Sequence, residues 1–237
     1  MKKNYKNKKR TKNKYIKKRD AKSIIIACED SVSAPTYFNS FLKKLKQKGK
    51  ITQDSLIIPH TGRTHPTGVL DDLVIYRNEE GKGFKEFDYK WIVIDRDKES
   101  MQGSGHSKED FEYALKKAKR LNIKVAYSNP SFELWYLLHF KRVIESIDRH
   151  EVIEEVIKEL KKLDKDMFRN LAIGNIKTQK NTKKITKRIK RFKKIALKNA
   201  QFLKRLHTTY KNRVNPESDN PLTNIDALIE LFDKLSR

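Results

Sequence analysis

The sequence predicts an α/β protein in which helices flank a mostly parallel β-sheet. Short apolar runs rich in β-branched residues, typical of buried strands, alternate with stretches of helical periodicity up to about residue 130. Beyond Pro130 the periodicity is helical only. Strands that alternate with helices favour a parallel sheet covered on both faces. We therefore expect an α/β core over residues 23–145, followed by a helical, basic region over residues 146–237 that packs on it.

The first strand is expected at residues 23–28, where an apolar Ile-Ile-Ile-Ala-Cys run follows a polar segment. A helix should come next, because Ser33 can cap it and Pro35 suits its first turn. Gly49 should end this helix. A second short strand is expected at residues 56–59.

The rest of the core repeats the same alternation. Residues 60–68 form a polar loop before an apolar helix at residues 69–76, and residues 89–94 are the clearest strand. Ser107 opens a further helix that runs to about Ala118. The fourth strand is expected at residues 123–127.

Four helices are predicted beyond Pro130. They are expected at residues 132–140, 152–163, 182–206 and 225–235. The third is long and basic, and Pro221 or Thr223 should begin the last one. His139 is expected in the core.

Acidic residues follow two of the predicted strands. Glu29 stands at the end of the first strand, and Asp95 and Asp97 follow the strand at residues 89–94. Ligands bind at the carboxyl ends of parallel strands, and oxygen donors are what Mg²⁺ or Mn²⁺ requires. We predict a metal site there, although Asp97 alone also fits a solvated loop residue. Glu133 is either a further ligand or base for water, or a helix N-terminal glutamate stabilised by the dipole.

The positive charge is confined to two segments. Of a net charge of +25, residues 1–22 carry +11 and residues 167–216 carry +16, so the remainder carries −2. Residues 1–22 have too little apolar content to fold alone and are expected to be disordered. Segments this basic predict binding to a phosphate backbone, with anionic membrane as the weaker alternative. The expected contacts are Arg63, Lys184, Lys187, Arg188, Lys190, Arg191, Lys193 and Lys194.

The single cysteine, Cys28, excludes an intrachain disulfide and a multi-cysteine zinc site, and it fits a reducing compartment. Neither a secretory signal nor an apolar stretch of membrane-spanning length is present. A cytoplasmic location without a membrane contact is expected. The oligomeric state is not encoded in any pattern that we recognise.

Several motifs together resemble the RloB family of bacterial proteins. They are the Cys-Glu-Asp at residues 28–30, the Ala-Pro-Thr-Tyr-Phe at 34–38, the Ile-Asp-Arg-Asp at 94–97, the specific Asn-Pro-Ser-Phe-Glu-Leu-Trp at 129–135 and the Asn-Pro-Leu-Thr at 220–223. The resemblance implies a Toprim-like fold and a magnesium-dependent nuclease, with Glu29 as the Toprim glutamate and Asp95 and Asp97 as its Asp-X-Asp pair. It also implies a role in phage defence beside an AAA-type ATPase. Ser31 and Ala34 stand where the family commonly has further glutamates, which leaves open the number of metal ions and the general base.

The resulting hypothesis is a metal-dependent endonuclease that cleaves RNA, such as tRNA, or DNA. The alternative is a non-catalytic nucleic-acid-binding protein with the same fold. Strand transfer or priming is disfavoured, because no breakage or polymerase module is evident. The sequence has no GxxxxGK[ST] phosphate loop, so an ATP-driven step would need a partner protein.

Overall fold

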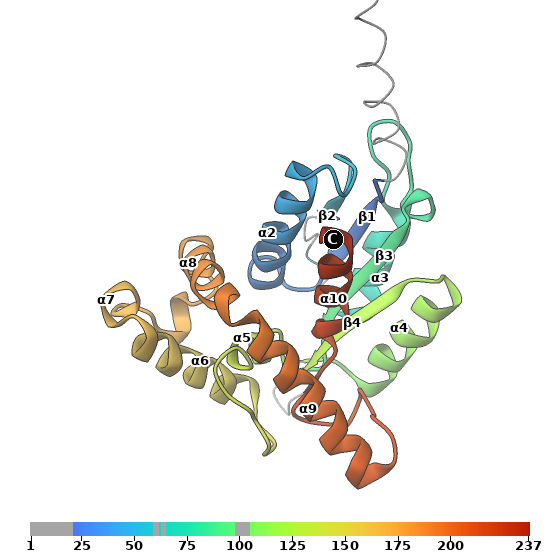
Figure 1. The fold of residues 1–237 in the computed structure, drawn as a ribbon. Coiled ribbons are helices and arrows are strands. Elements are labelled where there is room, and N and C mark those ends of the chain that lie inside the picture. The colour runs from blue at the N-terminus through green and yellow to red at the C-terminus, as the bar shows by residue number, and fades with distance from the viewer. Residues whose placement is uncertain (1–20, 59–61, 63–64, 98–104) are drawn as a thin grey trace, which may run out of the picture.

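A five-stranded sheet forms the centre of the computed structural model, which describes residues 21–58, 62, 65–97 and 105–237. The strands lie in the order β2-β1-β3-β4-β5. β1 pairs in parallel with β2 and β3, β3 pairs in parallel with β4, and β5 is antiparallel to β4. Their bounds are Ile24–Cys28, Leu56–Ile58, Tyr89–Asp95, Lys124–Asn129 and Leu222–Thr223. The predicted α/β fold is confirmed (Figure 1).

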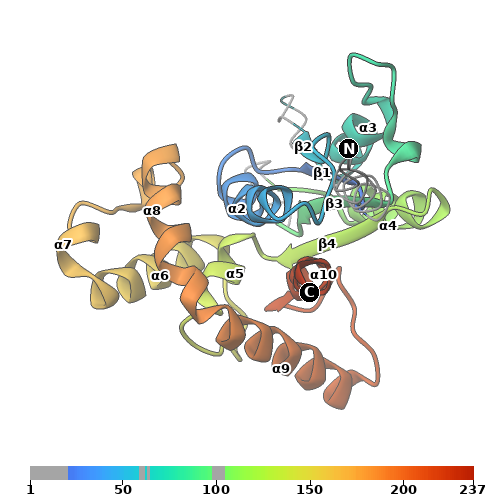
Figure 2. The same ribbon diagram turned by 45° about the horizontal axis from the view of Figure 1, so that its top comes forward.

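Helices cover both faces of the sheet. α3 (Pro66–Ile75) and α4 (Lys108–Arg120) lie on one face, and α2 (Ser33–Gln47) and α10 (Ile225–Ser236) on the other (Figures 1 and 2). All five residues of β1 are buried, with Ile24 in the core on the α2 side and Ile25 in the core on the α3 side. A strand buried on both faces explains why β1 reads as a continuous apolar run.

The remaining helices extend beyond β4 on the α2 side of the sheet, as Figure 2 shows. α5 packs against α6 and α9, and α8 packs against α2. Three short 3₁₀ turns, η1, η2 and η3, connect longer elements. The bounds are α5 Glu133–Leu137, α6 Arg149–Leu163, α7 Lys165–Phe168, α8 Gln179–Ile189, α9 Lys193–Lys211, η1 Phe84–Glu86, η2 Ile173–Asn175 and η3 Lys190–Phe192.

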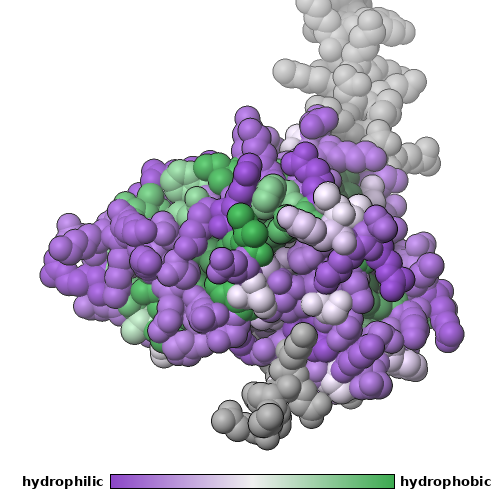
Figure 3. All heavy atoms as spheres, turned by 90° about the horizontal axis from the view of Figure 1, so that it is seen from below, coloured by the Kyte–Doolittle hydropathy of each residue, from purple (hydrophilic) through white to green (hydrophobic). Residues whose placement is uncertain are grey.

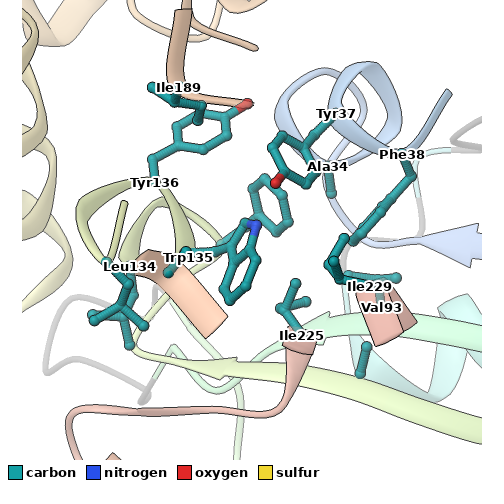
Figure 4. Close-up of a cluster of buried hydrophobic side chains, with 14 of the residues drawn as sticks. Ala34, Tyr37, Phe38, Val93, Leu134, Trp135, Tyr136, Ile189, Ile225 and Ile229 are labelled. Atoms are coloured by element: carbon teal, nitrogen blue, oxygen red, sulfur yellow. The ribbon is translucent and has the colours of Figure 1, made fainter. Parts of the chain in front are cut away.

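Aromatic side chains fill the junction between the sheet and these helices. Tyr37 of α2 meets Phe132 and Trp135 edge to face, with ring centroids 6.1 and 6.4 Å apart. Figure 4 shows Tyr37, Trp135 and Tyr136 converging on one cluster with Ile189 of α8. The Phe-Glu-Leu-Trp-Tyr segment is therefore a core element as well as the carrier of Glu133.

His139 lies in this core, as expected, and is 1% exposed. Its Nδ1–H donates to the Trp135 carbonyl at 2.8 Å, and Nε2 accepts from the Tyr37 hydroxyl at 3.1 Å. A neutral ring satisfies both nitrogens with these partners, and burial lowers the pKa of His139 to about 4.

This histidine predicts a loss of stability in mild acid. The unfolded chain takes up a proton near pH 6.5 and the native chain only near pH 4, so the free energy of unfolding should fall by about 2–3 kcal/mol as the pH drops through this window. His139→Gln should lose most of that slope. Urea unfolding of both proteins at the two ends of the window measures the difference, and equal slopes would contradict the assignment.

The long basic helix predicted at residues 182–206 is interrupted. The 3₁₀ turn η3 separates α8 from α9. No Pro or Gly marks the break, and it arises because α8 packs on α2 whereas α9 packs on α5, β5 and α10. Tertiary contacts here override a uniformly helical local preference.

The start of the last helix also differs from expectation. It begins at Ile225, and neither Pro221 nor Thr223 opens it, because Leu222–Thr223 form β5 against Ser128 and Asn129. A two-residue strand carries no periodicity and was missed. The Asn224 side chain secures the corner, with its oxygen accepting from the Tyr127 N–H at 2.6 Å.

Part of what the sequence predicts lies outside the described residues. This applies to residues 1–20 of the basic tail, to Arg63 and to most of the loop before α3. In the described ranges, none of the helices combines the length and apolarity that a bilayer crossing requires. The face of the molecule in Figure 3 is mostly hydrophilic, with smaller apolar patches between.

Candidate functional site

The acidic residues predicted at strand ends lie at the carboxyl edge of the sheet. Glu29 follows β1, and its N–H donates to the Val93 carbonyl of β3 at 2.9 Å; Asp95 is the last residue of β3. The chain leaves β1 for β2 on one side and returns to β3 on the other. The crevice between β1 and β3 is therefore the topological switch point, where open α/β sheets bind ligands.

Glu29 bridges the two strands and the segment that enters α4. Its Oε2 accepts from the Asp95 N–H at 3.0 Å, and its Oε1 lies 2.6 Å from His106 Nε2. Burial lowers the pKa of His106, but the hydrogen bond and charge of Glu29 outweigh it and raise that pKa overall. Glu29 therefore favours the protonated form of the His106 ring.

Asp95 is the least compensated acid of the site. It is 7% exposed, and no side chain in the described part of the chain donates a hydrogen bond to its carboxylate. Burial raises the pKa of Asp95 well above its ordinary value, and the charges of Glu29 and Glu133 raise it further. The ionised form of Asp95 is disfavoured unless a cation joins it.

Asp97 turns toward α6 and forms an ion pair with Arg149. Asp97 has a 21% exposed side chain, so it lies nearer the surface than Asp95. Burial alone would lower the pKa of Arg149, but the charge and hydrogen bond of Asp97, followed by the charges of Asp95 and Glu133, raise it. The Asp-X-Asp pair is thus in one electrostatic cluster, with the outer member held by an arginine.

Glu133 is completely buried beside this cluster. Its carboxylate accepts from Ser33 Oγ at 2.9 Å and Ser131 Oγ at 3.1 Å, and Lys177 Nζ lies 3.1 Å away. Burial alone would raise the pKa of Glu133, but Lys177 and the Ser33 hydroxyl lower it below its usual value. Glu133 is therefore held by Ser33, Ser131 and Lys177, and not only by the dipole at the start of α5.

Asp30 is a fifth acid of the cluster that the sequence reasoning missed. Its carboxylate accepts from the Ala34 and Val32 N–H groups at 2.7 and 3.2 Å and thereby caps α2. Burial and the charge of Glu133 raise the pKa of Asp30, and Lys177 partly offsets them. Lys177 thus serves two acids of the cluster.

The cluster carries more negative than positive charge. Three cationic groups, with His106 counted as protonated, face five carboxylates, so two negative charges are in excess when all are ionised. The acids are Glu29, Asp30, Asp95, Asp97 and Glu133, and the cations are His106, Arg149 and Lys177. A buried excess of carboxylate oxygens attracts a hard divalent cation.

The side chains do not form a complete metal cage as they stand. In the described ranges, no three His, Cys, Asp or Glu side chains are grouped so that they could hold a metal ion. Glu29 contacts the backbone N–H of Asp95, and one oxygen of Asp97 is held by Arg149. The chemistry of the donors fits Mg²⁺ or Mn²⁺, and the third ligand requires a rearrangement.

A comparison with known protein families shows which family the chain belongs to. The model of the RloB-like protein family matches residues 24–232, nearly the whole chain. The chain belongs to the RloB-like family. No curated protein and no solved structure matches it.

The predicted nucleic-acid contacts of this RloB-like protein fall into two groups. Arg188 and Lys193 form ion pairs with Asp164 and Asp233, so they hold the helices together. Lys187, Arg191 and Lys194 are exposed, whereas Lys184 and Lys190 are partly buried. Only the unpaired members are free to contact a phosphate.

A groove of about 820 Å³ lies between α2 and α8, beside β2. Lys43 contributes to one wall, and Lys183, Lys187 and Lys190 contribute to the other. Ser31, which is two residues after Glu29 in the chain, also lines the groove. Sequence periodicity placed these lysines on a helix but gave no indication that α2 stands opposite them.

Proposed function

We propose that this RloB-like protein is a metal-dependent phosphodiesterase that cleaves nucleic acid. The observation that carries the proposal is the buried Asp95, the least compensated acid of the site, beside Glu29 at the switch point of the sheet. A Toprim-like reading of the fold is part of the proposal, with Glu29 in the place of the Toprim glutamate and Asp95 and Asp97 in that of its acidic pair.

The residues of the cluster would have separate roles in this activity. Glu29 and Asp95, joined by Asp97, would hold Mg²⁺ or Mn²⁺. When bound, such an ion supplies Lewis-acid polarisation of a phosphate and activation of water. Lys177 keeps Glu133 ionised, and Arg149 keeps a positive charge beside Asp97, where an incoming phosphate would need one. Glu133 is buried and fully paired, so a supporting role suits it better than direct contact with water.

The cellular setting is also a proposal. Family membership supports an effector role in bacterial phage defence, in the cytoplasm, beside an AAA-type ATPase that would supply nucleotide hydrolysis. RNA, tRNA included, and DNA are both candidate substrates.

One alternative has a specific observation in its favour. Glu29 and Asp97 each have a partner within the protein, His106 and Arg149 respectively. A non-catalytic nucleic-acid-binding protein could use the same cluster as a purely structural network.

Dependence of cleavage on a metal ion distinguishes the phosphodiesterase from the non-catalytic alternative. Purified protein, alone and with its ATPase partner, is incubated with tRNA, single-stranded DNA and duplex DNA in Mg²⁺, in Mn²⁺ and in EDTA. We expect cleavage products of at least one substrate with either metal and none in EDTA. Binding without cleavage under every condition would favour the structural alternative.

A further inference from the structure

We infer that the groove between α2 and α8 binds a single strand of nucleic acid and leads it to the acidic cluster. The part of the inference that concerns the acidic cluster rests on the proposed function. The evidence for binding is separate: the charge, the size and lining, and the position of the groove.

Charge is the first argument. In the described part of the chain, Lys43, Lys183, Lys187 and Lys190 have no carboxylate partner, whereas the nearby Lys193 is paired with Asp233. Burial lowers the pKa of Lys190, and the neighbouring charges of Lys44 and Lys193 lower it further. Lysines crowded on facing walls without acids favour an anionic ligand.

The size of the groove and its aliphatic lining are the second argument. About 820 Å³ is the size of a pocket that encloses a small ligand, so it suits a short stretch of one strand rather than a duplex. Pro35, Ile57 and Ile58 line it with aliphatic surface between the lysines. Phosphates can therefore contact the walls while sugars and bases cover apolar atoms. No aromatic side chain lines the groove among the described residues, so electrostatics should dominate affinity.

Position is the third argument. Ser31 places one end of the groove two residues from Glu29, and Gln179 places it two residues from Lys177, the partner of Glu133. α2 and α8 pack on each other, so the two walls are held together by the fold. A strand that follows the lysines would reach the acids with one of its phosphates.

The test compares two double variants that remove equal charge. Lys183→Gln with Lys187→Gln removes two groove lysines, and Lys198→Gln with Arg205→Gln removes two exposed cations on α9 that do not line the groove. Binding of fluorescein-labelled oligo(U), oligo(dT) and a duplex of equal length is measured by anisotropy in EDTA, at several salt concentrations. All four positions are exposed, and unchanged melting temperatures would confirm intact folds.

We expect the groove variant to bind both single strands at least about tenfold more weakly than the wild type. Its slope of log affinity against log salt should fall by about 1.4, or about 0.7 for each lost phosphate contact. The α9 variant should change little, and the duplex should bind more weakly than either strand.

Equal losses in the two variants, or tighter binding of the duplex, would overturn the inference. The comparison of oligo(U) with oligo(dT) identifies which strand the groove prefers. Because EDTA prevents metal-dependent cleavage, binding in the groove can be established even if the phosphodiesterase proposal fails. If cleavage survives the loss of the groove lysines, the inferred role of the groove is wrong, but the phosphodiesterase proposal still holds.

Discussion

Asp95→Asn should abolish cleavage and at the same time stabilise the metal-free protein. Asp95 is buried beside Glu29 and Glu133, and their charges add to burial in disfavouring its anion. An amide removes that charge, which should raise the free energy of unfolding by about 0.5–2 kcal/mol and the melting temperature by about 2–4 °C per kcal/mol. Loss of a metal ligand should lower the cleavage rate by about 10³-fold or more.

The matched control is Asp97→Asn. Asp97 is paired with Arg149, so its loss removes a favourable ion pair and should not raise the melting temperature. Mg²⁺ should stabilise the wild type more than Asp95→Asn, because only the wild type retains both inner carboxylates. Differential scanning fluorimetry and the cleavage assay measure the two effects. A less stable Asp95→Asn protein would show that Asp95 is not under like-charge repulsion, and full cleavage activity would remove it from the site.

Such a result would fit a general pattern in which a functional site lowers stability. Natural proteins retain unfavourable charges where a ligand compensates them. The pairing of Glu29 with His106 then has a physical reason, since it limits the repulsion that Glu29 adds to Asp95.

Glu29 and Asp95 could be predicted from the sequence because the strand that precedes each of them is a local pattern. Glu29 and Asp95 each follow an apolar run, and parallel pairing of β1 with β3 brings the ends of those runs together. Two strands and their direction were enough to place both acids at one edge. Their partners could not be found in this way.

His106, Arg149 and Lys177 come from three separate segments, and each stands in an ordinary polar context. Arg149 is the first residue of α6, behind an Asp148 cap, and Lys177 precedes the cap of α8. In the sequence these cations look like surface residues. The packing of α6 and α8 brings Arg149 and Lys177 to the acids, and the segment before α4 brings His106.

The interruption of the basic helix has the same origin. α8 packs on α2, whereas α9 packs on α5, β5 and α10. The buried positions Ile185, Ile189, Ala196 and Ala200 nevertheless keep a helical spacing across the break. A periodic pattern states which side of a helix is buried but not that its two halves meet different partners. The groove lysines were therefore predicted as helical and basic, and their position opposite Lys43 was not.

Lys177→Met should destabilise the protein severely, by about 3 kcal/mol or more. Lys177 Nζ lies 3.1 Å from the Glu133 carboxylate, which is completely buried, and it also offsets the charges of Asp30 and Asp95. Removal of one partner of a buried ion pair leaves the other charge without compensation, and the cost exceeds the net value of the pair. Glu133 would then have to remain charged in an apolar site or take up a proton.

A double-mutant cycle distinguishes this loss of charge balance from a loss of packing. Adding Glu133→Gln to Lys177→Met removes the uncompensated charge and leaves an amide that Ser33 and Ser131 can still contact, so most of the lost stability should return. Lys180→Met is the control, because Lys180 is exposed in the first turn of α8 and its loss should change the free energy of unfolding by no more than about 0.5 kcal/mol. Urea unfolding of the wild type, Lys177→Met, Glu133→Gln and the double variant gives the coupling energy. If the double variant is as unstable as Lys177→Met, Lys177 acts through packing, and the electrostatic account of Glu133 fails.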